Sequence, residues 1–91
     1  MVSRAYIETT VEFVRTHYPN DVALVALMDA LVTAARDADA LAMRGVELAV
    51  GEHRVPHNEI AHMVRVAEAQ AKVEALTGAA RVALERLAPK A

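Results

Sequence analysis

The apolar residues of the first segment, about residues 3–17, recur at the spacing of one helix face. Ile7, Val11, Val14 and Tyr18 follow one another at intervals of four, three and four residues. Polar residues lie between them, so the segment is predicted to form an amphipathic helix with one buried side. The three aromatic residues of the protein belong to this segment or directly follow it, and we expect them to supply the bulky part of the core.

Two longer segments, about residues 21–50 and 57–88, carry the same kind of pattern without interruption. In the first, apolar or small residues alternate at intervals of three and four: Leu24, Leu27, Leu31, Ala34, Ala38, Leu41, Gly45 and Leu48. In the second, the corresponding positions are Met63, Val66, Gln70, Val73, Thr77, Ala80, Leu84 and Leu87. This regularity favours two long helices that pack along their length, and the absence of sustained alternation with period two argues against strands.

Residues that interrupt helices fall between these segments. Pro19, Asn20 and Asp21 separate the first from the second, and Asn20 or Asp21 can cap the second helix. Residues 51–56 begin with glycine and end with proline, and a turn this short between helices of equal length makes them antiparallel neighbours. The sequence therefore predicts one all-α domain, residues 1–91, with a long antiparallel helical hairpin and a short N-terminal helix.

Folding the chain about this turn places Gly45 opposite Met63 and Ala38 opposite Gln70. A glycine inside a helix costs about 1 kcal/mol relative to alanine, and room for the Met63 side chain would explain it. Gln70 and Thr77 are polar residues on the predicted contact between the two helices. We interpret them as residues that set the register or bond to the backbone.

The hairpin carries further apolar residues beside this contact. A first helix of about 15 residues covers only half of a hairpin about 43 Å long, and its connection at Pro19 places it away from the turn. On the other half, a set of apolar residues remains uncovered. We call it the apolar strip: Ala42, Val46, Ala49, Ile60, Val64 and Ala67. Such a surface usually marks an interface, and two hairpins paired about a twofold axis would bury it in a four-helix core. The alternative is a first helix that bends across the strip, or a monomer that tolerates an alanine-rich surface.

Composition narrows the possible functions. The 91 residues are 55% hydrophobic, lack cysteine and carry a net charge of −2, which excludes a disordered tail, a disulfide scaffold and cysteine chemistry. Ten basic residues against twelve acidic ones give no electrostatic footprint for nucleic acid or an anionic membrane. The longest apolar run, residues 22–28, is far shorter than the ~20 residues of a spanning helix. We expect a cytoplasmic protein, and the excess of alanine, valine and arginine suggests a bacterial, GC-rich genome.

Three of the four histidines and two acidic residues cluster at the predicted turn: Glu52, His53, His57, Glu59 and His62. Glu59 and His62 form a Glu-x-x-His pair, which places a carboxylate and an imidazole on one helix face, as in di-iron helical bundles. His57 and His62 lie about 140° apart around a helix and do not share a face. We interpret the histidines as solvated turn residues, with a transition-metal site as the alternative.

The sequence shows neither an evident nucleophile–base pair nor a glycine-rich phosphate loop. We therefore predict a protein–protein interaction or oligomerisation module with no catalytic chemistry and no cofactor of its own. Its expected partner is a second copy, as a homodimer, or another helical protein. The alternative function is a bundle that binds a metal or small ligand near the turn through Glu59 and His62.

Overall fold

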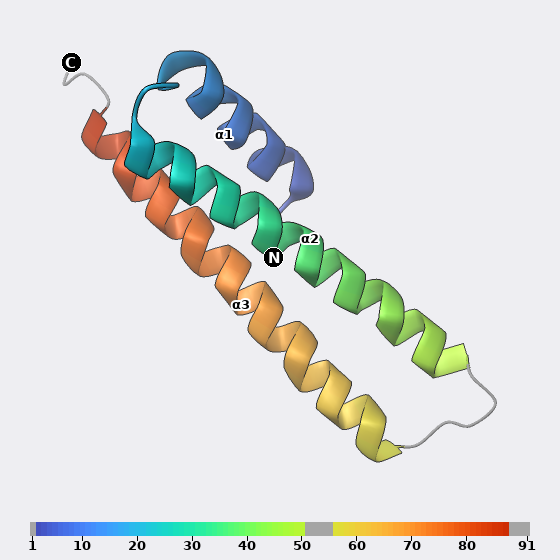
Figure 1. Ribbon diagram of the computed structural model, residues 1–91. Helices are drawn as coiled ribbons and strands as arrows, with labels where there is room; N and C mark the ends of the chain where they lie inside the picture. Colours follow the sequence, from blue (N-terminus) through green and yellow to red (C-terminus); the bar gives the residue numbers. More distant parts are fainter. Residues whose placement is uncertain (1, 51–55, 88–91) are drawn as a thin grey trace.

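The structure is a computed structural model that describes residues 2–50 and 56–87, with side chains at 2–44 and 59–87. Three helices account for the fold: α1 (Arg4–His17), α2 (Val22–Val50) and α3 (Pro56–Leu87) (Figure 1). The described residues contain no strand. The all-α prediction is confirmed, and no helix end differs from its expected position by more than one residue.

The helix ends are fixed by the side chains and backbone groups expected there. The Ser3 Oγ accepts a hydrogen bond of 3.1 Å from the Tyr6 N–H at the start of α1. The Asp21 Oδ1 accepts one of 3.0 Å from the Leu24 N–H at the start of α2. Of the two candidate caps, Asp21 is therefore the one that is used. α3 begins at Pro56, whose missing N–H costs nothing in a first helical turn.

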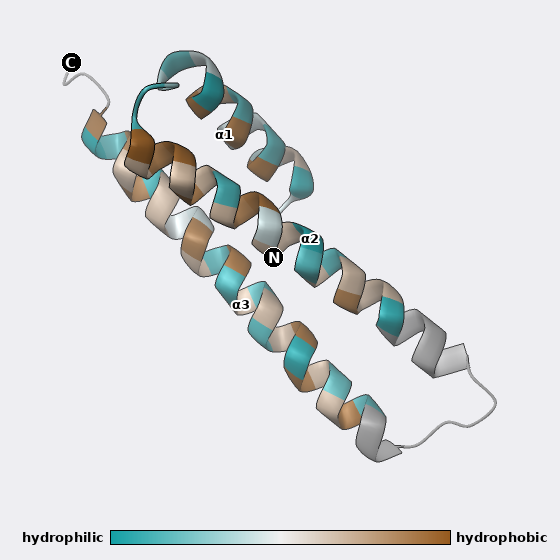
Figure 2. Cartoon of the chain, viewed as in Figure 1, coloured by the Kyte–Doolittle hydropathy of each residue, from teal (hydrophilic) through white to brown (hydrophobic). Residues whose placement is uncertain are grey.

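α2 and α3 lie side by side as an antiparallel hairpin, and α1 lies along the half of the hairpin that contains the start of α2 (Figure 1). The apolar positions of α1 face the hairpin (Figure 2). This is the placement that the connection at Pro19 predicted. The molecule is long and narrow, 57 × 20 × 18 Å. Its radius of gyration is 16.5 Å, whereas a compact chain of this length has about 12 Å.

The buried core occupies only the half of the hairpin that α1 covers. Its fully or almost fully buried apolar residues are Ile7, Val11, Val14, Leu24, Met28, Leu31, Ala34, Val73 and Ala80. No described side chain between 35 and 44 or between 59 and 72 is buried. Among the described residues, the end of the hairpin near Val50 and Pro56 is thus a two-helix layer that no third element covers.

The contact between α2 and α3 differs from the expected one in a single row of α3. Val66, Val73 and Ala80 face α2 as predicted, and the buried Thr77 donates a hydrogen bond of 2.7 Å to the Val73 carbonyl. Met63, however, is 68% exposed and not buried in the contact as expected, and its predicted neighbour Gly45 lies outside the residues whose side chains the structure describes. Gln70 is also exposed. The half-buried row on α3 instead contains His62, Ala69, Leu76 and Ala83.

The reason lies in the seven-residue repeat of α3. Met63 and Gln70 are exposed, whereas Thr77 and Leu84 of the same row are buried and half-buried. A straight helix drifts by about 20° per seven residues relative to such a row, so the row that faces α2 near Leu84 has turned to the surface at Met63. The neighbouring row, through Ala69 and His62, is half-buried there instead.

Gly78 offers a direct test of the packing around α3. It is half-buried inside the helix, yet a Cβ added there meets no neighbouring atom within 4 Å. Gly78→Ala should therefore raise the free energy of unfolding by about 0.5–1 kcal/mol, through helix propensity alone. Urea denaturation at one fixed protein concentration measures it. The exposed neighbour is the control, and Ala79→Gly should lower stability by a similar amount. A loss of stability in Gly78→Ala would show that the space beside it is filled.

Candidate interaction surface

The apolar strip lies on the part of the hairpin that α1 leaves uncovered. With 14 residues, α1 is about 21 Å long, whereas the 29 residues of α2 extend about 43 Å. α1 begins beside the middle of α2, where the Arg4 guanidinium bonds to the Asp39 carboxylate. No described element covers the strip beyond this point.

Every member of the strip with a described side chain is exposed. Ile60 is 63% exposed and Val64 is 52% exposed, and Ala42 and Ala67 are exposed as well. The side chains of Val46 and Ala49 lie outside the described residues. The strip therefore contains exposed residues of both α2 and α3.

Two methionines enlarge this surface and were not predicted to belong to it. Met63 lies three residues after Ile60 and four before Ala67, and Met43 lies three residues before Val46, which is the spacing of one helix face. They are 68% and 65% exposed, respectively. Helical spacing would have placed Met63 in the strip had it not been assigned to the contact with α2. Exposed methionines suit an interface because their side chains adapt to the shape of a partner.

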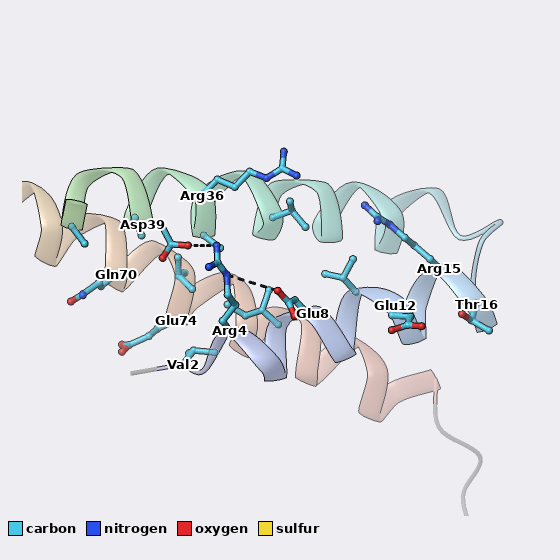
Figure 3. Close-up of a pocket in the computed structure, with 17 residues that line it drawn as sticks. Val2, Arg4, Glu8, Glu12, Arg15, Thr16, Arg36, Asp39, Gln70 and Glu74 are labelled. Carbon is cyan, nitrogen blue, oxygen red and sulfur yellow. Dashed lines mark hydrogen bonds and ion pairs between the residues drawn. The ribbon is translucent and has the colours of Figure 1, made fainter. Parts of the chain in front are cut away.

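A groove of about 710 Å³ adjoins the strip (Figure 3). It lies between α1 and the hairpin, and its residues come from all three helices: Val2, Arg4, Ile7, Glu8, Val11, Glu12, Arg15, Thr16, Val32, Ala35, Arg36, Ala38, Asp39, Ala42, Gln70, Val73 and Glu74. Three small side chains of α2, namely Ala35, Ala38 and Ala42, create much of its space. The groove could not be predicted from the alanines of α2, because alanines at these positions fit a close helix contact equally well.

Ion pairs between α1 and α2 lie at both ends of the groove. Arg4 binds Asp39 at one end and lies 3.8 Å from Glu8 on its own helix. At the other end, the Arg15 guanidinium lies 3.8 Å from the Asp29 carboxylate. All of these side chains are exposed, so each pair contributes at most about 1 kcal/mol, and α1 is held on the hairpin mainly by its buried residues Ile7, Val11 and Val14.

The proposed metal ligands are only partly within the described residues. Glu52 and His53 lie outside them, as does the side chain of His57. Glu59 and His62 are both half-buried and lie one turn apart on α3. Among the described side chains, no group of three or more histidines and acidic residues is placed to hold a metal ion. The structure therefore brings together the Glu-x-x-His pair and no further ligand from the part of the chain it describes.

His62 is half-buried, whereas the turn histidines were expected to be solvated. Its Nε2 is buried and makes no hydrogen bond. A buried nitrogen without a partner lowers stability, because the lost contact with water is not replaced.

Comparison with protein families, curated proteins and solved structures finds no match for this chain. No described helix has the length and apolar character required to cross a membrane.

Replacing the His62 imidazole with an apolar side chain of similar size should stabilise the protein. We expect His62→Leu to raise the free energy of unfolding by about 1 kcal/mol, because it removes the buried Nε2 that lacks a partner. Thermal or urea unfolding measures the change, and His62→Gln, which keeps a polar group there, serves as the control. A bound transition metal in the wild type that is lost in His62→Leu would contradict this and favour the metal site.

Proposed function

We propose that this chain is a self-associating helical module that forms a homodimer through the apolar strip. The observation that carries the proposal is the distribution of apolar side chains. The half of the hairpin near Val50 and Pro56 contains no buried residue among its described side chains, yet exposes Ile60, Met63 and Val64. Apolar surface gathered in this way is stabilised when a partner removes it from water.

The surface area of the chain supports a partner of substantial size. A folded monomer of 9.8 kDa exposes about 5,200 Å², whereas this chain exposes 6842 Å². The difference, about 1,600 Å², is twice the ~800 Å² that each partner buries in a typical stable complex. A second copy could cover the whole uncovered half of the hairpin within this area.

A second copy suits the chemistry of the strip. All six of its members are apolar and uncharged, so the strip itself brings no charge into the contact with another chain. Alanines beside isoleucine and valine also let two helices approach closely. The product would be a core of four helices in place of an exposed two-helix layer, which is the arrangement that common twofold dimers adopt.

The module would act by binding and not by catalysis. Ser3, the single serine, has its hydroxyl engaged as the cap of α1. Four of the charged side chains that line the groove, Arg4, Glu8, Arg15 and Asp39, are engaged in ion pairs within α1 or between α1 and α2. These contacts serve to shape a surface for a partner.

A charge placed in the strip should separate the dimer. Val64→Glu would bury a carboxylate without a partner at the contact, so we expect a dimer in the wild type and a folded monomer in the variant. Light scattering at tens of micromolar gives the mass, and circular dichroism checks that the helices remain. The matched control is Val82→Glu, since Val82 is a 44% exposed valine of the same helix outside the strip. A monomeric wild type, or a dimer that Val64→Glu leaves intact, would overturn the proposal.

A further inference from the structure

The groove and the apolar strip form one continuous surface. Ala42 belongs to both, and Gln70, which lines the groove, follows the strip residue Ala67 by one helix turn. A partner that covers the strip therefore also meets the end of the groove. We propose that in the homodimer the strip of each copy fills the groove of the other. This inference rests on the self-association proposed above and specifies its geometry.

The positions of the two features along α2 permit this exchange. The groove extends from Val32 to Ala42, and the strip from Ala42 to Ala49. Their centres are separated by about 13 Å at the rise of a helix. A twofold axis that crosses α2 near Ala42, perpendicular to the helix, places the strip of one copy over the groove of the other. The two hairpins then lie antiparallel.

The two surfaces also complement each other in shape. The strip presents large side chains, since Ile60, Met63 and Val64 are each more than half exposed. The groove is hollow because Ala35 and Ala38 are small, and its floor includes the buried side chains of Ile7, Val11 and Val73. Large side chains that enter a space lined by small ones reproduce the packing of a protein interior. Pairing strip against strip would instead oppose large residues and leave about 710 Å³ open.

The groove needs no rearrangement to receive a partner. The ion pairs Arg4–Asp39 and Arg15–Asp29 connect α1 to α2 at its two ends. Because α1 is already packed on the hairpin through its buried residues Ile7, Val11 and Val14, binding does not require the cost of ordering α1. The surface area is adequate as well. The chain exposes about 1,600 Å² more than a compact monomer of its mass, whereas each partner in a typical stable complex buries ~800 Å².

Disulfide cross-linking tests this arrangement, since the chain contains no cysteine. Ala35→Cys in the groove and Met63→Cys beside the strip are prepared as separate full-length proteins, one with a removable tag that changes its mass. After mixing and mild oxidation, the mixed 35–63 product should predominate, and Met63→Cys alone should give little cross-linked dimer. The matched control is Ala30→Cys, at an exposed position of α2 outside the groove, which should not cross-link to Met63→Cys.

The outcomes separate this inference from the proposed function. Predominant 63–63 product, or no cross-link in a protein that light scattering shows to be dimeric, would overturn the strip-in-groove arrangement and leave self-association standing. A monomeric wild type would overturn both.

A groove-filling variant provides a second test. Ala35→Leu should raise the dimer dissociation constant at least tenfold, whereas Ala30→Leu should leave it unchanged. The dye 8-anilinonaphthalene-1-sulfonate should bind the Val64→Glu monomer and not the dimer, where the groove is filled. Equal dye binding by both would show that a small amphiphile can occupy the groove in the dimer, and would also overturn the inference.

Discussion

The difference in length between α1 and the hairpin determines the architecture of this protein. A helix about 21 Å long cannot cover two helices about 43 and 48 Å long, so only part of the hairpin acquires a third layer. Where α1 is present, Met28 and Leu31 are completely buried. Where it is absent, no described side chain is buried, and large apolar residues remain in water. The short connection through Pro19 determines which half is covered, because it keeps α1 beside the start of α2.

The features that local chemistry determines could be predicted from the sequence. Ile7, Val11 and Val14 repeat at helical spacing between polar residues, which leaves α1 only one face to bury, and they are buried. Asp21 follows a proline and precedes an apolar run, and it caps α2. These outcomes depend on a few neighbouring residues, so tertiary packing did not change them.

The change of row along α3 could not be predicted in the same way. The row through Met63 and the row through His62 both repeat every seven residues, so which of them faces α2 near the turn depends on the whole contact between the two helices. The groove could not be predicted either, for a related reason. Ala35 and Ala38 fit either a close helix contact or an empty space, and only the position of α1 determines which occurs. Of the apolar strip, the exposure of Ala42, Ile60, Val64 and Ala67 agrees with the prediction. The use of this surface by a second copy remains a proposal.

The segregation of the core gives the two halves of the hairpin different resistance to local opening. Backbone amides near Leu31 and Ala80 are protected by buried side chains on several sides, so their exchange with solvent requires disruption of most of the core. Amides near Ala42 and Val64 depend on the α2–α3 contact alone. In an isolated chain, the helices can therefore fray from the end near Val50 and Pro56 while the half beneath α1 stays intact. Association would then complete folding as well as bring two copies together, and the order of the uncovered half would increase with protein concentration.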